Sequence, residues 1–360
     1  MFLPDTFNGA LALLGVSLFC WGSWGNSLKF SKLTFPQFYS VFGVSIFFWA
    51  ALLGLVLGGD YYSQDLEHHD FLRNLHNASI DSIGYAMGAG AIFNVANSLL
   101  AVLVGLVGLS VSFPICIGIG LIAGTLLTYC VSTPYNKAHT NLSLLCLGLV
   151  LAMVALCSMA LAHHLKNTTQ RNDEETPLVI TSNQAPDEEP QGLSFSRLIM
   201  LCVLCGSVMG CFSPLSALSQ DVNRPGHLNP YTCMFFFCLS AMITTAPIVF
   251  LLHSRPLDGA LTQSNLWSNF SNSSCKDKLW PVLGGLVWTL GTLLNFVSGS
   301  RVSFAIAYAI GQAAPVAAAL WGIFYFQEFQ GAPTKSFGCM GLMFVFYGAA
   351  VAALAMSSSS

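Results

Sequence analysis

Ten apolar runs, each about twenty residues long, occupy most of this chain of 360 residues. A helix needs about 20 mostly apolar residues to cross the roughly 30 Å hydrocarbon core of a bilayer. Only 8% of the residues are charged, about a third of the share in a soluble globular protein. The sequence therefore predicts an all-α integral membrane protein with ten transmembrane helices. The predicted spans are about 7–28, 36–58, 83–107, 110–131, 142–163, 196–218, 231–253, 279–299, 303–326 and 336–356.

Charge and cysteine placement exclude several other classes. A formal net charge of −3 provides no basic surface for nucleic acid. The first Lys or Arg is Lys29, so the first apolar run lacks the basic region of a cleaved signal peptide and is predicted to be a retained helix. Of the 12 cysteines, all but Cys275 lie in or at the ends of apolar runs, where they behave as small apolar side chains. We expect no metal site and no cofactor.

The acidic segment 164–195 divides the ten spans into five and five. Spans four and nine share a pattern at an offset of 191: residues 111–113 and 302–304 both read Val-Ser-Phe, and Gly120 matches Gly311. Five spans per unit place the two halves in opposite orientations, which is the inverted repeat of many secondary transporters. The predicted domains are a first five-helix repeat at 1–163, an acidic disordered linker at 164–195 and a second five-helix repeat at 196–360.

Orientation in the membrane follows from the basic residues. Most of the 13 Lys and Arg lie in loops on the side opposite the two termini, and the positive-inside rule then places the termini outside or in a lumen. The sequon at Asn77 would be luminal and is a predicted glycosylation site, whereas three other sequons would face the cytosol. The chain is expected in the plasma membrane or an endomembrane.

The polar side chains inside the predicted spans are mostly neutral. No Asp or Lys lies far from a span end, and no His lies in an interior, so the usual intramembrane proton relays are not predicted. Amides can both donate and accept hydrogen bonds, which suits a neutral polar solute, although such amides often bond a neighbouring helix instead. Trp side chains offer flat surfaces for a ring. The candidate solute-binding residues are Trp24, Asn26, Asn94, Asn97, Asn295, Tyr308, Gln312 and Trp321.

Glu328 closes the ninth span and has two interpretations. It could be an interfacial residue whose charge reaches the aqueous phase, as Lys29 and Arg301 could be. The alternative is a gate or a proton-coupling carboxylate.

Several motifs resemble those of the ureide permeases, within the drug/metabolite transporter superfamily. The segment from Gln312 through Pro315 and Trp321 to Glu328 resembles that family's Q-x-x-P…W-G-I-x-x-F-x-E pattern. Shorter elements elsewhere in the chain also match in the same order. These elements are Gly22-Ser23-Trp24, Pro36-Gln37, Gly108-Leu109-Ser110-Val111 and Phe212-Ser213-Pro214.

The resemblance implies a ten-helix, five-plus-five fold that carries neutral oxo-nitrogen rings, such as allantoin and uracil, with proton coupling. Two features depart from the family. Segment 164–195 lacks the Walker-like G-x-x-x-x-G-K stretch of plant members, and Gly25 stands where the family has Pro.

We therefore predict alternating access, with spans one, three, six, eight and nine lining a central cavity. A sugar, nucleoside or nucleotide-sugar carrier is the first alternative, although a nucleotide-sugar carrier would be expected to have Lys or Arg inside the pore. A receptor or scaffold in the membrane is the second alternative. An enzyme is not predicted, because no nucleophile–base pair or phosphate loop lies in the spans.

Overall fold

The computed structural model describes residues 1–59, 70–107, 109–132, 139–174, 195–254 and 270–358, and within them the chain forms helices and no named strand. Ten helical spans are long and apolar enough to cross a membrane, which confirms the predicted class and number. They are α1 (Phe7–Ser23) with α2 (Asn26–Phe30), α3 (Phe35–Leu57), α5 (Ile80–Val107), α6 (Leu109–Val131), α8 (Leu142–Glu174), α9 (Phe195–Gly210) with α10 (Phe212–Ser219), α11 (Pro230–Ser254), α13 (Cys275–Val302), α14 (Phe304–Gly311) with α15 (Pro315–Leu320) and the π-helix η1 (Trp321–Tyr325), and α16 (Thr334–Ser357).

Polar caps explain where two spans begin. The Oε1 atom of Gln37 accepts a hydrogen bond from the Thr34 amide at 3.1 Å, which satisfies a free backbone donor ahead of α3. The Oγ atom of Ser274 accepts a hydrogen bond from the Asp277 amide at 3.1 Å. This cap starts α13 at Cys275, ahead of the apolar run predicted from residue 279.

The predicted linker differs from the structure at its first end. Helix α8 continues to Glu174 instead of ending near residue 163, so 164–174 is helical. Residues 175–194 lie outside the described residues. Outside the spans, α4 (Phe71–Asn77) is a short helix in the polar stretch between spans two and three.

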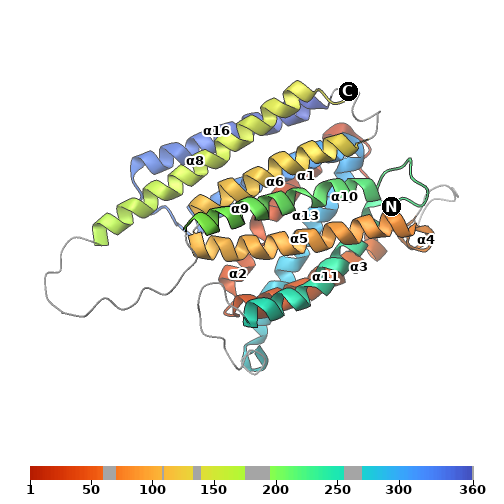
Figure 1. Cartoon of the computed structure of the whole chain (residues 1–360), viewed down its shortest axis with the longest axis horizontal. Helices are drawn as coiled ribbons and strands as arrows, with labels where there is room; N and C mark the ends of the chain where they lie inside the picture. The colour runs from red at the N-terminus through yellow and green to blue at the C-terminus, as the bar shows by residue number, and fades with distance from the viewer. Residues whose placement is uncertain (60–69, 108, 133–138, 175–194, 255–269, 359–360) are drawn as a thin grey trace.

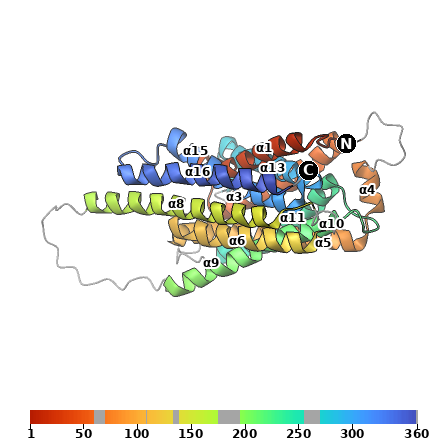
Figure 2. The same cartoon turned by 90° about the horizontal axis from the view of Figure 1, so that it is seen from above.

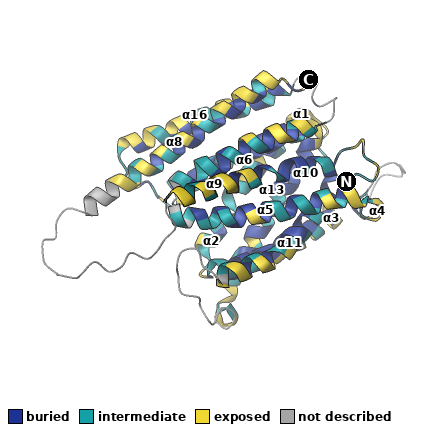
Figure 3. Cartoon of the chain, in the orientation of Figure 1, coloured by how far each residue is buried: buried dark blue, intermediate teal, exposed yellow. Residues whose placement is uncertain are grey.

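Both termini lie at one end of the bundle, and the far end of α8 lies at the other (Figures 1 and 2). Helices α8 and α16 run side by side along one flank. Elsewhere α1 packs on α13, α3 on α11 and α13, α5 on α11, and α6 on α9. Buried residues concentrate on the inner helices and exposed ones on the outer faces, as a lipid-facing surface requires (Figure 3).

Three spans are interrupted. Span one ends its first helix at Trp24 and restarts at Asn26, and the Ser27 hydroxyl donates to the Trp24 carbonyl at 2.6 Å. Span six is interrupted at Cys211, and span nine between Gly311 and Pro315. Backbone groups released inside a membrane need such local partners.

Glycines bring the interrupted helices close to their neighbours. A Cβ atom on Gly22 would overlap the Ala314 carbonyl oxygen, so only glycine fits where span one meets span nine. A Cβ atom on Gly210 would lie 2.8 Å from the Cβ of Ala123, where span six meets span four. Ala123 and Ala314 are related by the offset of 191 seen in the sequence.

Candidate functional site: a cavity lined by amides and indoles

A cavity of about 360 Å³ lies next to the interruptions of spans one and nine. Spans one, three, six, eight and nine line it as predicted, and spans four and five also contribute, through Phe113, Ile117, Met159 and His163. The lining also includes Lys29, at the second half of span one, and Glu328, in the turn after η1.

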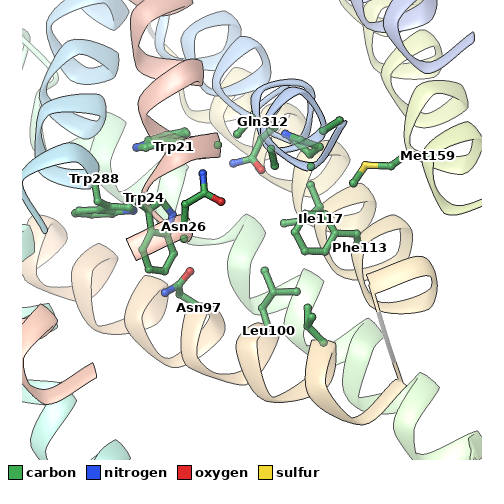
Figure 4. Close-up of a pocket in the computed structure, with 18 of the residues that line it drawn as sticks. Trp21, Trp24, Asn26, Asn97, Leu100, Phe113, Ile117, Met159, Trp288 and Gln312 are labelled. Carbon is green, nitrogen blue, oxygen red and sulfur yellow. The ribbon is translucent and has the colours of Figure 1, made fainter. Parts of the chain in front are cut away.

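Three amide side chains from three separate elements line the cavity. Asn26 is the first residue of α2, Asn97 lies within α5, and Gln312 follows α14. Figure 4 shows all three directed toward the same space. Because they come from different spans, no local pattern in the sequence could bring them together.

A hydrogen-bond chain orients Asn97. Its Nδ2 donates to the Tyr39 hydroxyl at 3.1 Å, and that hydroxyl donates to Oδ1 of Asn94 at 2.8 Å. Asn94 in turn donates from Nδ2 to the Ala241 carbonyl at 2.9 Å and to Thr245 Oγ1 at 3.1 Å. Since Nδ2 of Asn97 is committed to Tyr39, its Oδ1 is left as an acceptor at the cavity wall.

Asn26 and Gln312 have uncommitted polar atoms. Nδ2 of Asn26 is buried and has no hydrogen-bond partner among the described residues. Gln312 is 9% exposed, and its side chain makes no hydrogen bond within the described part of the chain. A buried polar atom without a partner costs about 1–3 kcal/mol, so Nδ2 of Asn26 favours a bound solute or water.

Indole rings form one wall. Trp21, Trp24 and Trp288 line the cavity and lie together in Figure 4. Trp24 stacks on Phe42 with ring centroids 4.8 Å apart. The Trp21 Nε1 donates to Thr292 Oγ1 at 3.1 Å, which holds that ring in place. The wall is therefore rigid and apolar, with a face suited to a planar ring.

Titratable side chains lie at one end of the cavity. Nζ of Lys29 and Oε1 of Glu328 form an ion pair at 2.5 Å, and Lys29 also lies 4.2 Å from the centroid of the Phe326 ring. Both charges are partly exposed, at 50% and 31% of their side-chain surface. His163 of α8 completes this end of the lining. We call Lys29, Glu328 and His163 the mouth cluster.

A family model described as ureide permease matches residues 38–194 and 193–358. The chain belongs to the ureide permease family. Ureide permease 4 and ureide permease 1 of Arabidopsis thaliana are each 24% identical to it, with 99% of both chains covered. Probable ureide permease A3 of Vigna unguiculata is 25% identical, covering 94% of this chain and 100% of that protein. This is a family of transporters, so the chain is a multi-pass membrane transporter and not an enzyme.

The family motifs lie around the cavity. Gly22 and Trp24 of the first motif line it, as do Gln312, Pro315 and Glu328 of the ninth-span segment. At the position where the resemblance expects proline, Gly25 has a φ of −62°, which is within the range of proline. A Cβ atom there would meet nothing within 4 Å, so Gly25 leaves the cavity locally wider.

Four predicted residues do not line the cavity, because other helices use their polar atoms. The Asn94 side chain is hydrogen-bonded to Tyr39, Ala241 and Thr245. Asn295 donates to the Ala307 carbonyl at 2.8 Å, and Tyr308 donates to the Gly120 carbonyl at 3.0 Å. Trp321 donates to the Ser23 hydroxyl at 2.8 Å. We therefore assign these four residues to helix packing.

The cavity also contains residues that the sequence interpretation missed. Trp21 lies about one helical turn before Trp24, so its pairing with Trp24 could have been anticipated from helical spacing. No sequence signal marked Trp288, because it lies in an apolar run beside equally apolar residues. The sequence places His163 at a span end, and the approach of the turn after η1 makes that position part of the cavity wall.

The exposed Asn77 ends α4, at the same end of the bundle as the termini. It remains a predicted glycosylation site.

A second cavity, of about 610 Å³, lies at the termini end and includes Gln220 and Phe304 in its lining. Aromatic side chains pack together at the first cavity, which Phe93 and Phe212 line. Phe212 and Tyr308 are edge to face with ring centroids 5.4 Å apart, and the ring centroids of Phe212 and Phe93 are 5.3 Å apart. We call Phe93, Phe212 and Tyr308 the barrier, since we propose below that these rings separate the first cavity from the second.

Proposed function

We propose that the chain transports small neutral oxo-nitrogen heterocycles, namely ureides such as allantoin and nucleobases such as uracil. The observation that carries this proposal is the set of three amides from three spans, with uncommitted donors and acceptors, facing one cavity beside indole rings. Related proteins named ureide permeases add support.

The chemistry of such a solute complements the cavity. A planar ring would stack on the Trp24 indole. A ring N–H would donate to Oδ1 of Asn97, and a ring carbonyl would accept from Nδ2 of Asn26. Gln312 can do either. Each partner is neutral, so binding requires no desolvation of a charge.

A nucleotide-sugar carrier is the less favoured alternative. A diphosphate needs an uncommitted cation, and Lys29, which lines the cavity, is already paired with Glu328. Sugars and nucleosides remain neutral competitors that share the hydrogen-bonding chemistry of ureides. A receptor or scaffold would not require two cavities divided by a barrier.

We further propose transport by alternating access between inverted halves. Contacts between Gly22 and Ala314 and between Gly210 and Ala123 are the arrangement expected of a pseudo-two-fold axis. The mouth cluster belongs to the lining of the cavity, and the packed rings of the barrier would close the cavity toward the termini end. The structure would then represent the state open toward the far end of α8, which the basic residues assign to the cytosol.

Proton coupling is part of the proposal. Of the two roles considered for Glu328, its ion pair with Lys29 favours a gate between α2 and the turn after η1. Because each half of the gate lies on a different interrupted span, opening and closing would separate and join the pair.

The test is uptake of radiolabelled uracil and allantoin into cells expressing the chain, at external pH 5.5 and 7.5, with surface expression measured in parallel. Saturable uptake of either solute, greater at pH 5.5, supports the proposal. Counterflow in proteoliposomes distinguishes a carrier from a receptor. Surface protein without uptake of either solute contradicts the substrate assignment.

A further inference from the structure

One titratable side chain of the mouth cluster, that of His163, has no ion-pair partner within the described part of the chain. Lys29 and Glu328 are paired with each other. His163 lines the cavity and makes no hydrogen bond or ion pair with any described residue. Histidine is the side chain whose ordinary titration falls between pH 5 and 8.

Packing holds the His163 ring toward the turn after η1. The ring lies edge-on to Phe329 with centroids 5.0 Å apart, and Phe329 is buried. The Ser336 hydroxyl of α16 donates to the carbonyl of Ala162, one residue before His163, at 2.6 Å. The ring therefore has a defined position relative to the gate.

Charged groups from each neighbouring element act on this ring. Glu328 comes from the turn after η1, Lys29 from α2 and Lys166 from α8 itself, and all three interact electrostatically with His163. Lys335, at the start of α16, is exposed. A proton on His163 is attracted by Glu328 and repelled by Lys29 and Lys166.

We propose that His163 is the proton-binding residue of the transport cavity and that its protonation is linked to the Lys29–Glu328 pair. This inference rests on the proposed transport function and specifies its proton coupling. A proton from the solvent binds the unprotonated ring nitrogen and converts the neutral imidazole to imidazolium. The imidazolium then competes with Lys29 for the Glu328 carboxylate.

Thermodynamic linkage explains why the proton-binding residue has to be coupled to the gate. A proton can drive transport only if its affinity differs between the two conformations of the carrier. Lys29 and Glu328 lie on the interrupted spans, and movement of either segment changes the electric field at His163. The same movement therefore opens the gate and alters proton affinity. Because thermodynamic coupling is reciprocal, protonation of His163 also shifts the equilibrium between the open and the closed gate.

The first test needs no solute. Histidine-labelled full-length protein in nanodiscs is titrated from pH 5 to pH 8 by NMR, and His163→Gln identifies the resonance. We expect this resonance to titrate within the range, with a midpoint that shifts in Glu328→Gln. A His163 that does not titrate, or a midpoint that is unchanged in Glu328→Gln, overturns the proposal.

The second test uses uracil and allantoin in proteoliposomes. We expect His163→Gln to lose most of the accumulation driven by an inward proton gradient, measured relative to the same variant's own counterflow at symmetric pH. His164→Gln, the exposed neighbour on α8, is the matched control and should accumulate solute as the wild type does. Undiminished gradient-driven accumulation in His163→Gln overturns the proposal. Absence of wild-type counterflow with both solutes contradicts the proposed function, and the NMR titration then decides the inference independently.

Discussion

Nζ of Lys29 lies 2.5 Å from Oε1 of Glu328, and this ion pair joins α2 to the turn after η1 at the mouth of the cavity. The two residues are 299 positions apart, at the ends of spans one and nine. Since each residue belongs to a different interrupted span, the pair reports the relative position of two segments that alternating access would move.

Charge exchange tests this gate. Lys29→Glu places two carboxylates together, and we expect uptake to fall roughly five- to tenfold, within the usual range of coupling between sites. The double variant Lys29→Glu/Glu328→Lys should recover much of the loss. Thermal stability should change little, because a partly exposed pair contributes about 0–1 kcal/mol. If the double variant is no better than the worse single variant, the pair is not a gate.

Asn97 and Asn94 should respond differently to alanine. Asn97→Ala removes one acceptor from the cavity, so we expect solute affinity to weaken by about two- to tenfold, with little change in melting temperature. Asn94→Ala leaves the Tyr39 hydroxyl without its acceptor, and stability should fall by about 1–3 kcal/mol. Radioligand saturation and fluorescence-detected melting separate the two effects.

Gln312→Ala provides the companion measurement for this site. We expect weaker solute affinity by a similar factor, since its side chain has no partner to lose in the described part of the protein. If Asn97→Ala and Gln312→Ala both leave the KM for uptake unchanged, the solute does not bind between these amides.

Gly22 should tolerate no side chain. A Cβ atom there would overlap the Ala314 carbonyl oxygen, so Gly22→Ala should cost about 1–3 kcal/mol by overpacking. Gly15 lies on the same helix and is exposed, and a Cβ atom added to it would meet nothing within 4 Å, so Gly15→Ala is the matched control. Equal melting temperatures for the two variants would contradict the close packing of spans one and nine.

If the barrier closes the first cavity toward the second, removing one of its rings should let solute leak through the protein. Phe212→Ala should connect the two cavities and permit downhill solute flux through loaded proteoliposomes without a counter-solute. Because a buried Phe→Ala change costs about 3–5 kcal/mol, Phe212→Leu offers a milder version. Phe250→Ala, on the exposed face of α11, is the control and should not leak. If vesicles that contain either Phe212 variant release no more solute than vesicles with the wild type, the barrier lies elsewhere.

Much of the architecture could be predicted from local composition. A run of about twenty apolar residues has one stable outcome in a bilayer, a helix that satisfies its own backbone, so the ten spans follow directly. The motifs around Gln312 and Trp24 indicated the family for a similar reason, since they are contiguous in the chain. Helix ends were less predictable where a polar cap, as at Ser274, extends a helix beyond its apolar run.

The choice among the amides was decided only by the tertiary structure. Asn94 and Asn97 are three residues apart on one helix face, and their spacing makes them equivalent in the sequence. Packing places Tyr39 and Thr245 around Asn94 and leaves Oδ1 of Asn97 at the cavity. An amide has a fixed number of donors and acceptors, and helices distant in the chain determine which of them remain for a solute.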